Sequence, residues 1–444
     1  MGRLFGTDGV RGVAGAELTA DLATAVGRSA VEVLSAGDEG PPSIVVGRDP
    51  RESGTWLEAA IVDGIRLAGG EVLLAGVEPT PAIAFLTTAE GADAGIMISA
   101  SHNPPEYNGI KIFGPNGMKL PDALEDRIEA SIGAGASGTA PSPGRVRELG
   151  GGRERYLAHL EAAAEGSLDG MTLVVDCANG AASAIAPELY RRLGATVRAI
   201  HASPDGRNIN VGSGALHPEV VGAAVVDAGA DAGITHDGDA DRALFVDHEG
   251  RLVDGDQVLA ACAIAMKQAG TLRGDRVVTT VMANIGFHRA MQEAGISVSA
   301  TKVGDRYVLE EMLEEDAVLG GEQSGHLIFR EHATTGDGLL TAVRFLSIAA
   351  VSGRSVAELG SLMRRYPQVL RNVRVRSIVE LDAASGVWDL VRSVEEEVAG
   401  SGRVLVRASG TEPLVRVMVE AESEDVAERH ADAIADRVRA ELGG

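Results

Sequence analysis

The sequence has 444 residues, of which 45% are hydrophobic and 23% charged, so its length predicts roughly three or four globular domains. Its formal net charge of -24 at pH 7 argues against a nucleic-acid-binding surface, which needs a basic face. The sequence has no stretch of about 18 uninterrupted apolar residues and no apolar secretory signal, so we expect a cytoplasmic protein without a membrane or nucleic-acid partner.

Apolar strand-like runs alternate with helix-like stretches, which is typical of βαβ units with mainly parallel sheets. In a first domain, residues 1–151, we expect strands at 43–47, 71–75 and 94–98 and an amphipathic helix at 52–67. Residues 133–152 are rich in Gly, Ala, Ser and Pro, which predicts a flexible connection to the next domain.

A serine turn follows the last of these strands. Residues 98–104 (ISASHNP) place Ser101 at a strand end, where we expect it to be exposed to a cleft. Because Ser, Asn and Pro are common turn residues, this motif alone also fits an ordinary turn.

Two further domains repeat the pattern. For residues 152–252 and 253–366 we expect strands at 172–176, 232–235, 276–281 and 317–320, with helices at 181–193 and 287–293. The strands at 232–235 and 317–320 lead into residues 237–242 (DGDADR) and 321–326 (GEQSGH). Open α/β sheets bind ligands at the carboxyl ends of their strands, so we predict three related α/β domains around a central cleft.

The tail, residues 367–444, has a different order of expected strands and helices. We expect strands at 373–377, 403–407 and 415–421 and helices at 383–398 and 424–442, which form a smaller C-terminal α+β domain.

Four motifs, residues 98–104, 237–242, 321–326 and 407–413 (RASGTEP), stand in an order that resembles the alpha-D-phosphohexomutase superfamily. The opening residues 3–12 (RLFGTDGVRG) narrow this resemblance to the bacterial phosphoglucosamine mutases. The resemblance covers nearly the whole chain and implies that Ser101 is the phosphoserine and that the C-terminal domain caps the cleft.

Asp237, Asp239 and Asp241 alternate with small residues, so a turned loop can direct three carboxylates at one centre. Oxygen ligands favour Mg²⁺ or Ca²⁺ over zinc, and an EF-hand is excluded because Arg242 stands where its loop needs Gly. A cation beside a metal site is expected mainly when a phosphate lies between them. We therefore predict one Mg²⁺ per active site, bound by the three aspartates and a phosphoryl oxygen on Ser101.

Proton transfer needs a base, for which we predict Lys111, with a pKa lowered by burial among cations. The resemblance implies that Arg11 and Lys111 both lie beside the phosphoserine. His102 is expected to stabilise the serine loop rather than exchange protons, although it stays a candidate catalytic group.

The remaining candidate residues bind substrate. Glu322 and Ser324 can bind adjacent sugar hydroxyls, and His326 can contact the sugar or move a proton. Gly304 and Asp305 occupy the family's other sugar-facing loop, a segment that also fits an ordinary helix start. A phosphate nest is predicted from backbone amides, hydroxyls and arginines in the tail, with Arg242 as a further phosphate contact: Arg407, Ser409, Gly410, Thr411 and Arg416.

These features predict the interconversion of glucosamine 6-phosphate and glucosamine 1-phosphate through glucosamine 1,6-bisphosphate, which also acts as activator. The resemblance implies that the product supplies UDP-N-acetylglucosamine and cell-wall synthesis. A phosphomannomutase or phosphoglucomutase activity is the near alternative, although Gln323 and residues 5–9 favour glucosamine.

Two other functions are less well supported. An aspartate-nucleophile phosphatase would use residues 237–239 but leave Ser101 without a role, and a non-catalytic regulator would be expected to have lost the serine or an aspartate. The only partners predicted are sugar phosphates. The sequence does not specify the oligomeric state, and a homodimer is compatible with it.

Overall fold

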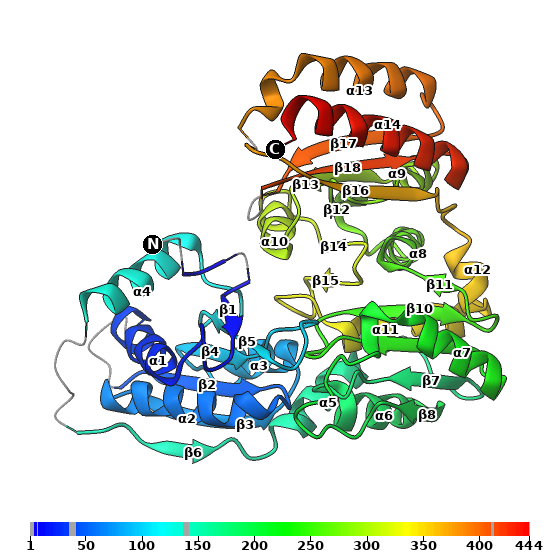
Figure 1. The fold of residues 1–444 in the computed structure, drawn as a ribbon. Coiled ribbons are helices and arrows are strands. Elements are labelled where there is room, and N and C mark those ends of the chain that lie inside the picture. The colour runs from blue at the N-terminus through cyan, green and yellow to red at the C-terminus, as the bar shows by residue number, and fades with distance from the viewer. Residues whose placement is uncertain are drawn as a thin grey trace. The chain divides into compact units, whose positions relative to one another are not determined.

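The computed structural model describes residues 4–6, 8–34, 41–135, 142–377, 379–409 and 413–443. The chain forms two compact units (Figure 1). The first comprises Met1–Val281 and Ile296–Ser361, and the second Met282–Gly295 and Leu362–Gly444. Among the helices of the described residues, none has the length and apolar character needed to cross a membrane.

The first sheet has six strands within the described residues, in the order β1-β5-β4-β2-β3-β6. Its strands are β1 Val10–Val13, β2 Ser43–Arg48, β3 Glu71–Val77, β4 Ala94–Ile98, β5 Tyr107–Phe113 and β6 Val146–Glu148, and its helices are α1 Ala20–Leu34, α2 Glu52–Leu67, α3 Thr80–Ala89 and α4 Asp122–Ala134. Ile44 and Val46 pack in one apolar cluster and Val45 in another. Both faces of β2 are therefore buried, which explains its unbroken apolar run.

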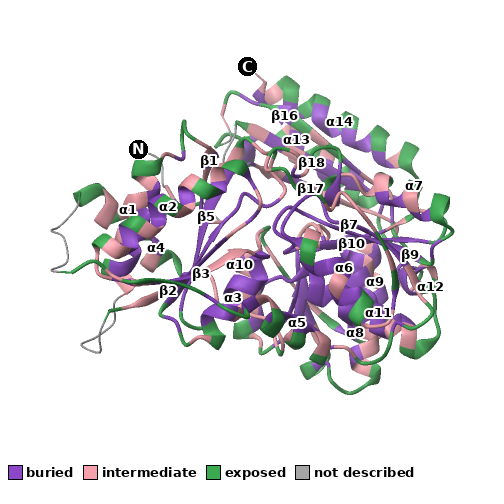
Figure 2. Cartoon of the chain, turned by 90° about the horizontal axis from the view of Figure 1, so that it is seen from below, coloured by how far each residue is buried: buried purple, intermediate pink, exposed green. Residues whose placement is uncertain are grey.

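Two further sheets of the first unit have, in the part of the chain described, the orders β11-β10-β9-β7-β8 and β13-β12-β14-β15. The strands are β7 Thr172–Asp176, β8 Thr196–Ile200, β9 Ala232–His236, β10 Ala243–Asp247, β11 Leu252–Val253, β12 Arg276–Thr280, β13 Ser297–Thr301, β14 Leu319–Gly321 and β15 Leu327–Phe329. Figure 2 shows buried residues along β7, β9 and β10 and exposed residues on α7.

The helices of this region are α-helices and short 3₁₀ turns, η1 and η2. Their bounds are α5 Gly152–Ala162, α6 Ala182–Arg192, η1 Gly214–Leu216, α7 Pro218–Ala228, α8 Gly255–Gln268, η2 Arg273–Asp275, α10 Asp305–Glu314, α11 Gly338–Ser352 and α12 Val356–Gly360. Local sequence sets their ends: Pro218 opens α7, and Gly229, with a φ of 58°, closes it. Asp254 and Gln257 form a capping box at the start of α8.

Each of the three sheets repeats one local feature. A strand of the parallel part leads into a motif and the chain returns antiparallel beside it, as β4 to β5, β9 to β10 and β14 to β15. The three motifs therefore occupy equivalent turns, as predicted from their places after strands. Parallel pairings outnumber antiparallel ones in the first and third sheets, as expected, and each of the three sheets is mixed because it gains an antiparallel partner after its motif.

The second unit contains an antiparallel sheet of order β16-β18-β17 in the residues described. Its elements are α9 Ile285–Glu293, β16 Gln368–Arg374, η3 Leu381–Ala383, α13 Ser385–Glu397, β17 Arg403–Ala408, β18 Leu414–Glu420 and α14 Glu424–Leu442. The start of α9 is held in this unit because Ile285 N donates to Glu420 Oε2 at 2.8 Å and Asn284 Nδ2 donates to the Tyr366 carbonyl at 2.9 Å.

Two local predictions were wrong. The strand predicted at 373–377 is β16, which ends at Arg374, because its register with β18 pairs Gln368 with Glu420 and Arg374 with Leu414. The connection at 133–152 is not wholly irregular, since β6 pairs with β3 inside it; residues 136–141 lie outside the described residues.

Candidate active site

The serine and aspartate motifs meet in the first unit. Ser101 Oγ donates to Asp237 Oδ2 at 2.6 Å, and His102 Nδ1 lies 3.3 Å from the same hydroxyl oxygen. Ser101 is 1% exposed, so the expectation of an exposed serine was wrong: the turn carrying Asp237 covers it. The serine also has a φ of 51°, a left-handed conformation that non-glycine residues rarely adopt.

Asp237, Asp239 and Asp241 are buried, and each offers a carboxylate oxygen within 4.8 Å of the others. Burial, together with the charges of Asp241 and Asp239, raises the pKa of Asp237 well above its ordinary value. Asp239 Oδ1 and Asp241 Oδ1 are buried and make no hydrogen bond within the described part of the chain. Buried anionic oxygens that make no hydrogen bond are suited to a hard cation, so this group can bind a metal ion.

Lys111 lies on β5 and is 1% exposed. Its Nζ atom lies 2.8 Å from Asp239 Oδ2, 3.3 Å from Asp241 Oδ2 and 3.4 Å from Asp8 Oδ2. Burial alone would lower the pKa of Lys111, but these three carboxylates raise it well above its ordinary value. The prediction that neighbouring cations lower the pKa of Lys111 was wrong, because carboxylates rather than cations surround its ammonium group.

Asp8 connects several basic side chains. Besides Lys111, it forms ion pairs with Arg11 and with Lys119. These contacts place Arg11 and Lys111 beside one carboxylate, although Asp8 was not predicted as a site residue.

Arg242, whose side chain is 22% exposed, is a second cation beside the aspartates. Its Nε atom lies 3.8 Å from Asp241 Oδ1. Burial lowers the pKa of His102 to about 4, and the positive charges of Arg242 and Arg11 contribute to this shift. The His102 ring is therefore neutral at pH 7.

The two predicted sugar-facing loops also come together. Gly304 N donates to Glu322 Oε1 at 3.2 Å. His326 is buried, with Nδ1 3.7 Å from Asp241 Oδ1 and Nε2 3.5 Å from Asp305 Oδ2. Ser324 Oγ is buried and has no hydrogen-bond partner among the residues described. Polar groups of both loops thus lie beside the aspartate motif.

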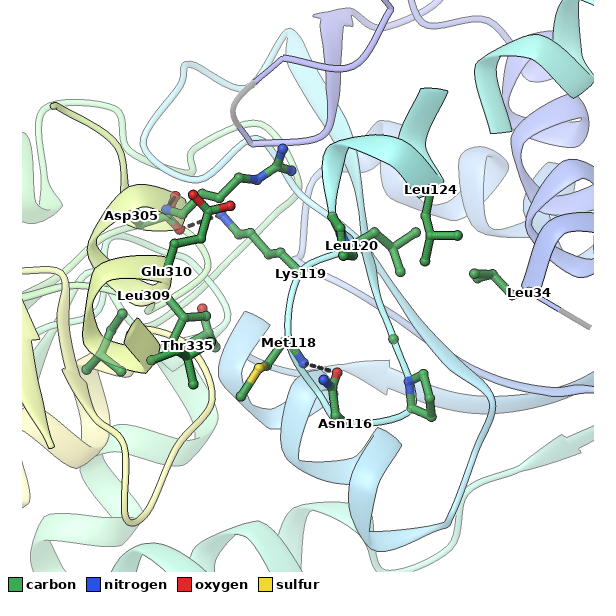
Figure 3. Close-up of a pocket in the computed structure, with 16 residues that line it drawn as sticks. Leu34, Asn116, Met118, Lys119, Leu120, Leu124, Asp305, Leu309, Glu310 and Thr335 are labelled. Atoms are coloured by element: carbon green, nitrogen blue, oxygen red, sulfur yellow. Dashed lines mark hydrogen bonds and ion pairs between the residues drawn. The ribbon is translucent and has the colours of Figure 1, made fainter. Parts of the chain in front are cut away.

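Lys119 links Asp8 to Asp305, and Figure 3 shows its side chain extending to Asp305. A cavity of about 460 Å³ lies beside this pair and is walled mainly by apolar side chains such as Leu120, Leu124 and Leu309 (Figure 3). The serine and aspartate motifs do not line it, so this cavity is not the centre of the candidate site.

The predicted phosphate nest lies in the second unit. Arg407 on β17 is paired in register with Arg416 on β18. Burial and the charge of Arg416 lower the pKa of Arg407, so an anion between the two guanidinium groups would be favoured. Ser409 is buried, and its N–H donates to the Leu414 carbonyl at 2.8 Å. Gly410 and Thr411 lie outside the described residues.

Comparison with known proteins places this arrangement in a family. The chain is 52% identical over 442 residues to phosphoglucosamine mutase of Mycolicibacterium paratuberculosis, covering 99% of this chain and 100% of that protein. It is 53% identical over 454 residues to phosphoglucosamine mutase of Frankia alni, covering 100% and 99%. The chain belongs to the phosphoglucosamine mutase family of the alpha-D-phosphohexomutases. The resemblance predicted from the motifs is therefore confirmed.

Family models and solved structures agree with this assignment. The phosphoglucomutase/phosphomannomutase alpha/beta/alpha domains I, II and III match residues 2–138, 154–250 and 254–366, and the C-terminal domain of that family matches residues 370–437. A phosphoglucomutase/phosphomannomutase family protein of Burkholderia thailandensis is similar at a TM-score of 0.83 and 26% identity, covering 99% of this chain and 97% of that one.

A more distant structure shares the fold. N-acetylphosphoglucosamine mutase of Aspergillus fumigatus, solved with GlcNAc-6P and magnesium, is similar at a TM-score of 0.72 and 19% identity, covering 99% of this chain and 96% of that one.

Sequence reasoning missed several residues that hold the site. Thr80 Oγ1 donates to Asp239 Oδ2 at 2.6 Å, and Ser99 Oγ donates to Asp49 Oδ2 at 2.7 Å. Arg51 is fully buried against the serine turn. These contacts join residues that are 50 to 159 positions apart in the sequence, so no local sequence pattern indicates them.

Proposed function

We propose that this chain interconverts glucosamine 6-phosphate and glucosamine 1-phosphate through a phosphorylated Ser101 and a glucosamine 1,6-bisphosphate intermediate. The observation that carries the proposal is the 2.6 Å contact of Ser101 Oγ with a buried aspartate of the candidate metal cluster. Full-length relatives that are 52% and 53% identical are named phosphoglucosamine mutase, which supports glucosamine as the sugar.

The metal in this proposal is one Mg²⁺, bound by Asp237, Asp239 and Asp241 together with an oxygen of the phosphorylated Ser101. Carboxylate oxygens suit that ion, and Asp239 and Asp241 each keep a buried oxygen without a hydrogen bond among the described residues. When bound, Mg²⁺ neutralises charge on the phosphoryl group during transfer.

The reaction has two transfers, and in the second the bond from phosphorus to the other sugar oxygen breaks and the bond to Ser101 Oγ forms again. In the first transfer the bond between phosphorus and Ser101 Oγ breaks and a bond from phosphorus to a sugar hydroxyl oxygen forms. The hydroxyl proton must leave, and the serine oxygen must gain one. His102 Nδ1, 3.3 Å from Ser101 Oγ, is a neutral group able to hydrogen-bond that oxygen. Lys111 and Arg11, paired with Asp8, supply positive charge on the phosphoserine side. In this state Lys111 is an ammonium held by three carboxylates, so accepting a proton requires that these contacts change.

Substrate recognition is divided in the proposal between two parts of the chain. Residues that bind the sugar are Gly304, Asp305, Glu322, Ser324 and His326. Residues that bind phosphate are Arg242, Arg407, Ser409, Gly410, Thr411 and Arg416. The domains would accordingly serve as phosphoserine (1–151), metal-binding (152–252), sugar-recognition (253–366) and phosphate-binding (367–444) domains.

A coupled assay that follows glucosamine 1-phosphate formation tests the proposal. It is run with glucosamine 1,6-bisphosphate as activator, and intact mass reports the phosphorylation state. We expect turnover with a phosphorylated enzyme and a higher kcat/KM for the glucosamine phosphates than for mannose or glucose phosphates. Equal or better use of a hexose phosphate would assign the alternative phosphomannomutase or phosphoglucomutase activity, and absence of turnover on all three sugars would contradict the mutase.

A further inference from the structure

Arg51 is a fully buried arginine in the turn between β2 and α2, 0% exposed. A buried guanidinium is costly unless its donors are satisfied, and its partners therefore indicate its role. One partner is Asp49, whose Oδ2 atom accepts from Arg51 Nε at 2.9 Å. The other side-chain bonds all reach a distant segment.

That segment is the serine turn. Arg51 Nη2 donates to the carbonyl of Ser101 at 3.0 Å and to the carbonyl of Asn103 at 2.8 Å. Arg51 Nη1 donates to the carbonyl of Tyr107 at 3.0 Å and also to that of Pro104. The guanidinium is planar and its donors are fixed in one fork, so a single side chain sets the relative positions of four carbonyls between residues 101 and 107.

The turn needs such support because Ser101 is held at a φ of 51°. A non-glycine residue in the left-handed region is strained and persists only where its surroundings over-determine it. Ser101 N donates to Ser99 Oγ at 2.9 Å, and Ser99 Oγ donates in turn to Asp49 Oδ2 at 2.7 Å. Asp49 therefore anchors both Arg51 and the serine that holds Ser101 N.

A second support comes from the neighbouring domain. Asn210 Nδ2 donates to the Ser101 carbonyl at 2.8 Å and to the Asn103 carbonyl at 3.0 Å. Arg51 and Asn210 thus donate to the same two carbonyls, those of Ser101 and Asn103. The hydroxyl of Ser101 therefore extends from a turn that both side chains hold in place.

We infer that Arg51 is a positioning residue for phosphoryl transfer: with Asn210 it clamps the carbonyls of the serine turn and so aims Ser101 Oγ at the aspartate cluster. The inference rests on the proposed function. A merely structural arginine would stabilise the domain without changing the transfer step in particular. A positioning arginine affects kcat far more than KM, because it touches neither the sugar nor the second phosphate.

The first test compares Arg51→Lys and Arg51→Met with the wild-type chain. Misplacement of a reacting group by about 1 Å can cost about 10²-fold in rate, so we expect Arg51→Met to lose about 10²-fold or more in kcat. We expect its KM for glucosamine 6-phosphate to stay within about threefold of wild type. Arg51→Lys keeps the charge and part of the donor set and should recover part of kcat. Hydrogen exchange of residues 99–107, which does not depend on activity, should be faster in both variants.

Asn210→Gly keeps the inference testable if the Arg51 variants do not fold. Asn210 has a φ of 60°, which glycine adopts without strain, so this change removes two hydrogen bonds to the turn with little cost to the backbone. We expect lower kcat, nearly unchanged KM and faster exchange in residues 99–107. The matched control is Arg207→Ala, which removes an exposed arginine bonded to Glu52 through two contacts of 2.7 Å and should leave all three readouts unchanged.

The outcomes separate the two hypotheses. A wild-type chain without mutase turnover would contradict the proposed function, whereas the exchange measurement would still report the clamp. With an active wild type, the inference is overturned if folded Arg51→Met or Asn210→Gly keeps wild-type kcat. It is also overturned if KM rises as much as kcat falls, or if exchange in residues 99–107 is unchanged.

Discussion

Ser101 Oγ and Asp237 Oδ2 lie 2.6 Å apart although 136 positions separate these residues in the sequence. The neighbouring Ser99 Oγ makes a different contact, donating to Asp49 Oδ2 at 2.7 Å. Of these two serines, only Ser101 has its hydroxyl bonded to the aspartate cluster. This difference decides which serine we expect to carry phosphate.

Ser101→Ala is expected to abolish turnover and to leave no exchangeable phosphate on the protein. Its melting temperature should fall by no more than the loss of the hydrogen bond to Asp237 accounts for, because serine and alanine bear a similar penalty at positive φ. Intact mass and phosphopeptide mapping provide the measurement. Ser99→Ala is the control and should still be phosphorylated at Ser101. Phosphate mapped to Ser99, or substantial turnover by Ser101→Ala, would contradict this prediction.

Asp237→Asn is expected to stabilise the metal-free protein and to weaken metal binding. Three buried carboxylates within 4.8 Å repel one another when no cation is bound. Asparagine can keep both contacts of Asp237, accepting from Arg242 N and donating to Ser101 Oγ, while removing one charge.

Melting temperatures measured with and without Mg²⁺ test this prediction. Mg²⁺ at 100 times its Kd should stabilise the wild type by about 2.7 kcal/mol and the variant much less at the same concentration. The variant should also lose on the order of 10²-fold or more in kcat. Asp227→Asn removes an exposed carboxylate paired with Arg198 and serves as the control. An equal Mg²⁺ response in Asp237→Asn, or activity that survives exhaustive chelation, would show that the cluster does not bind the required metal.

Much of the fold could be predicted because the apolar pattern changes where the elements change. Helix α2 begins at Glu52 and ends at Leu67 as predicted, and strands β4 and β7 also have the predicted bounds. The motifs that contain Ser101, Asp237 and Glu322 could be placed because each follows a strand that is buried along its whole length, which favours small and apolar residues. The strand at 373–377 was misplaced because β16 (QVLRNVR) has only three apolar residues among its seven and no regular alternation, and its register depends on β18 rather than on local composition.

The environment of Lys111 could not be predicted in the same way. Its three carboxylate partners come from the N-terminal signature and from the turn after β9, and Asp239 is 128 positions away in the sequence. Arg51 gave no signal either, since an arginine just before a helix fits an exposed helix start. Such long-range polar contacts depend on how sheets pack, which residue order alone does not specify.

Asp337→Asn is expected to change how stability depends on pH. Burial raises the pKa of the Asp337 carboxyl to about 6. The folded protein therefore binds more protons here than the unfolded chain between about pH 4 and 6, where an ordinary Asp has lost its proton, and stability falls as pH rises through this window. Asparagine does not titrate and can still accept from Leu340 N.

Relative to the wild type, Asp337→Asn should therefore become more stable as pH rises from 4 to 7, by about 1.4 kcal/mol for each unit of the pKa difference. Thermal melts of both proteins at several pH values provide the measurement, with the exposed Asp389→Asn as control. A stability difference that is constant across this range would show that the Asp337 pKa is not raised.

Arg407 and Arg416 occupy paired positions on β17 and β18, and the charge of Arg416 contributes to the lowered pKa of Arg407. In the proposed reaction one site must hold the 6-phosphate while position 1 reacts and the 1-phosphate while position 6 reacts. Arg407→Ala should therefore raise KM for glucosamine 6-phosphate and glucosamine 1-phosphate by similar factors, since a lost charge-assisted contact is worth about 1.5 to 3 kcal/mol.

The same change should let the bisphosphate escape more often, because the intermediate must reorient while the second phosphate is still held. Arg407→Ala should then need added glucosamine 1,6-bisphosphate to stay phosphorylated, which intact mass can follow. Arg371→Ala is the matched control, because Arg371 lies in the same sheet but bonds Asp432 on the surface, with Nε 2.7 Å from Oδ1. Steady-state kinetics in both directions, with and without the bisphosphate, decide the question. Impairment confined to one direction would show that the arginine pair does not serve both phosphates, because a shared site must weaken both reactions when it loses the same contact.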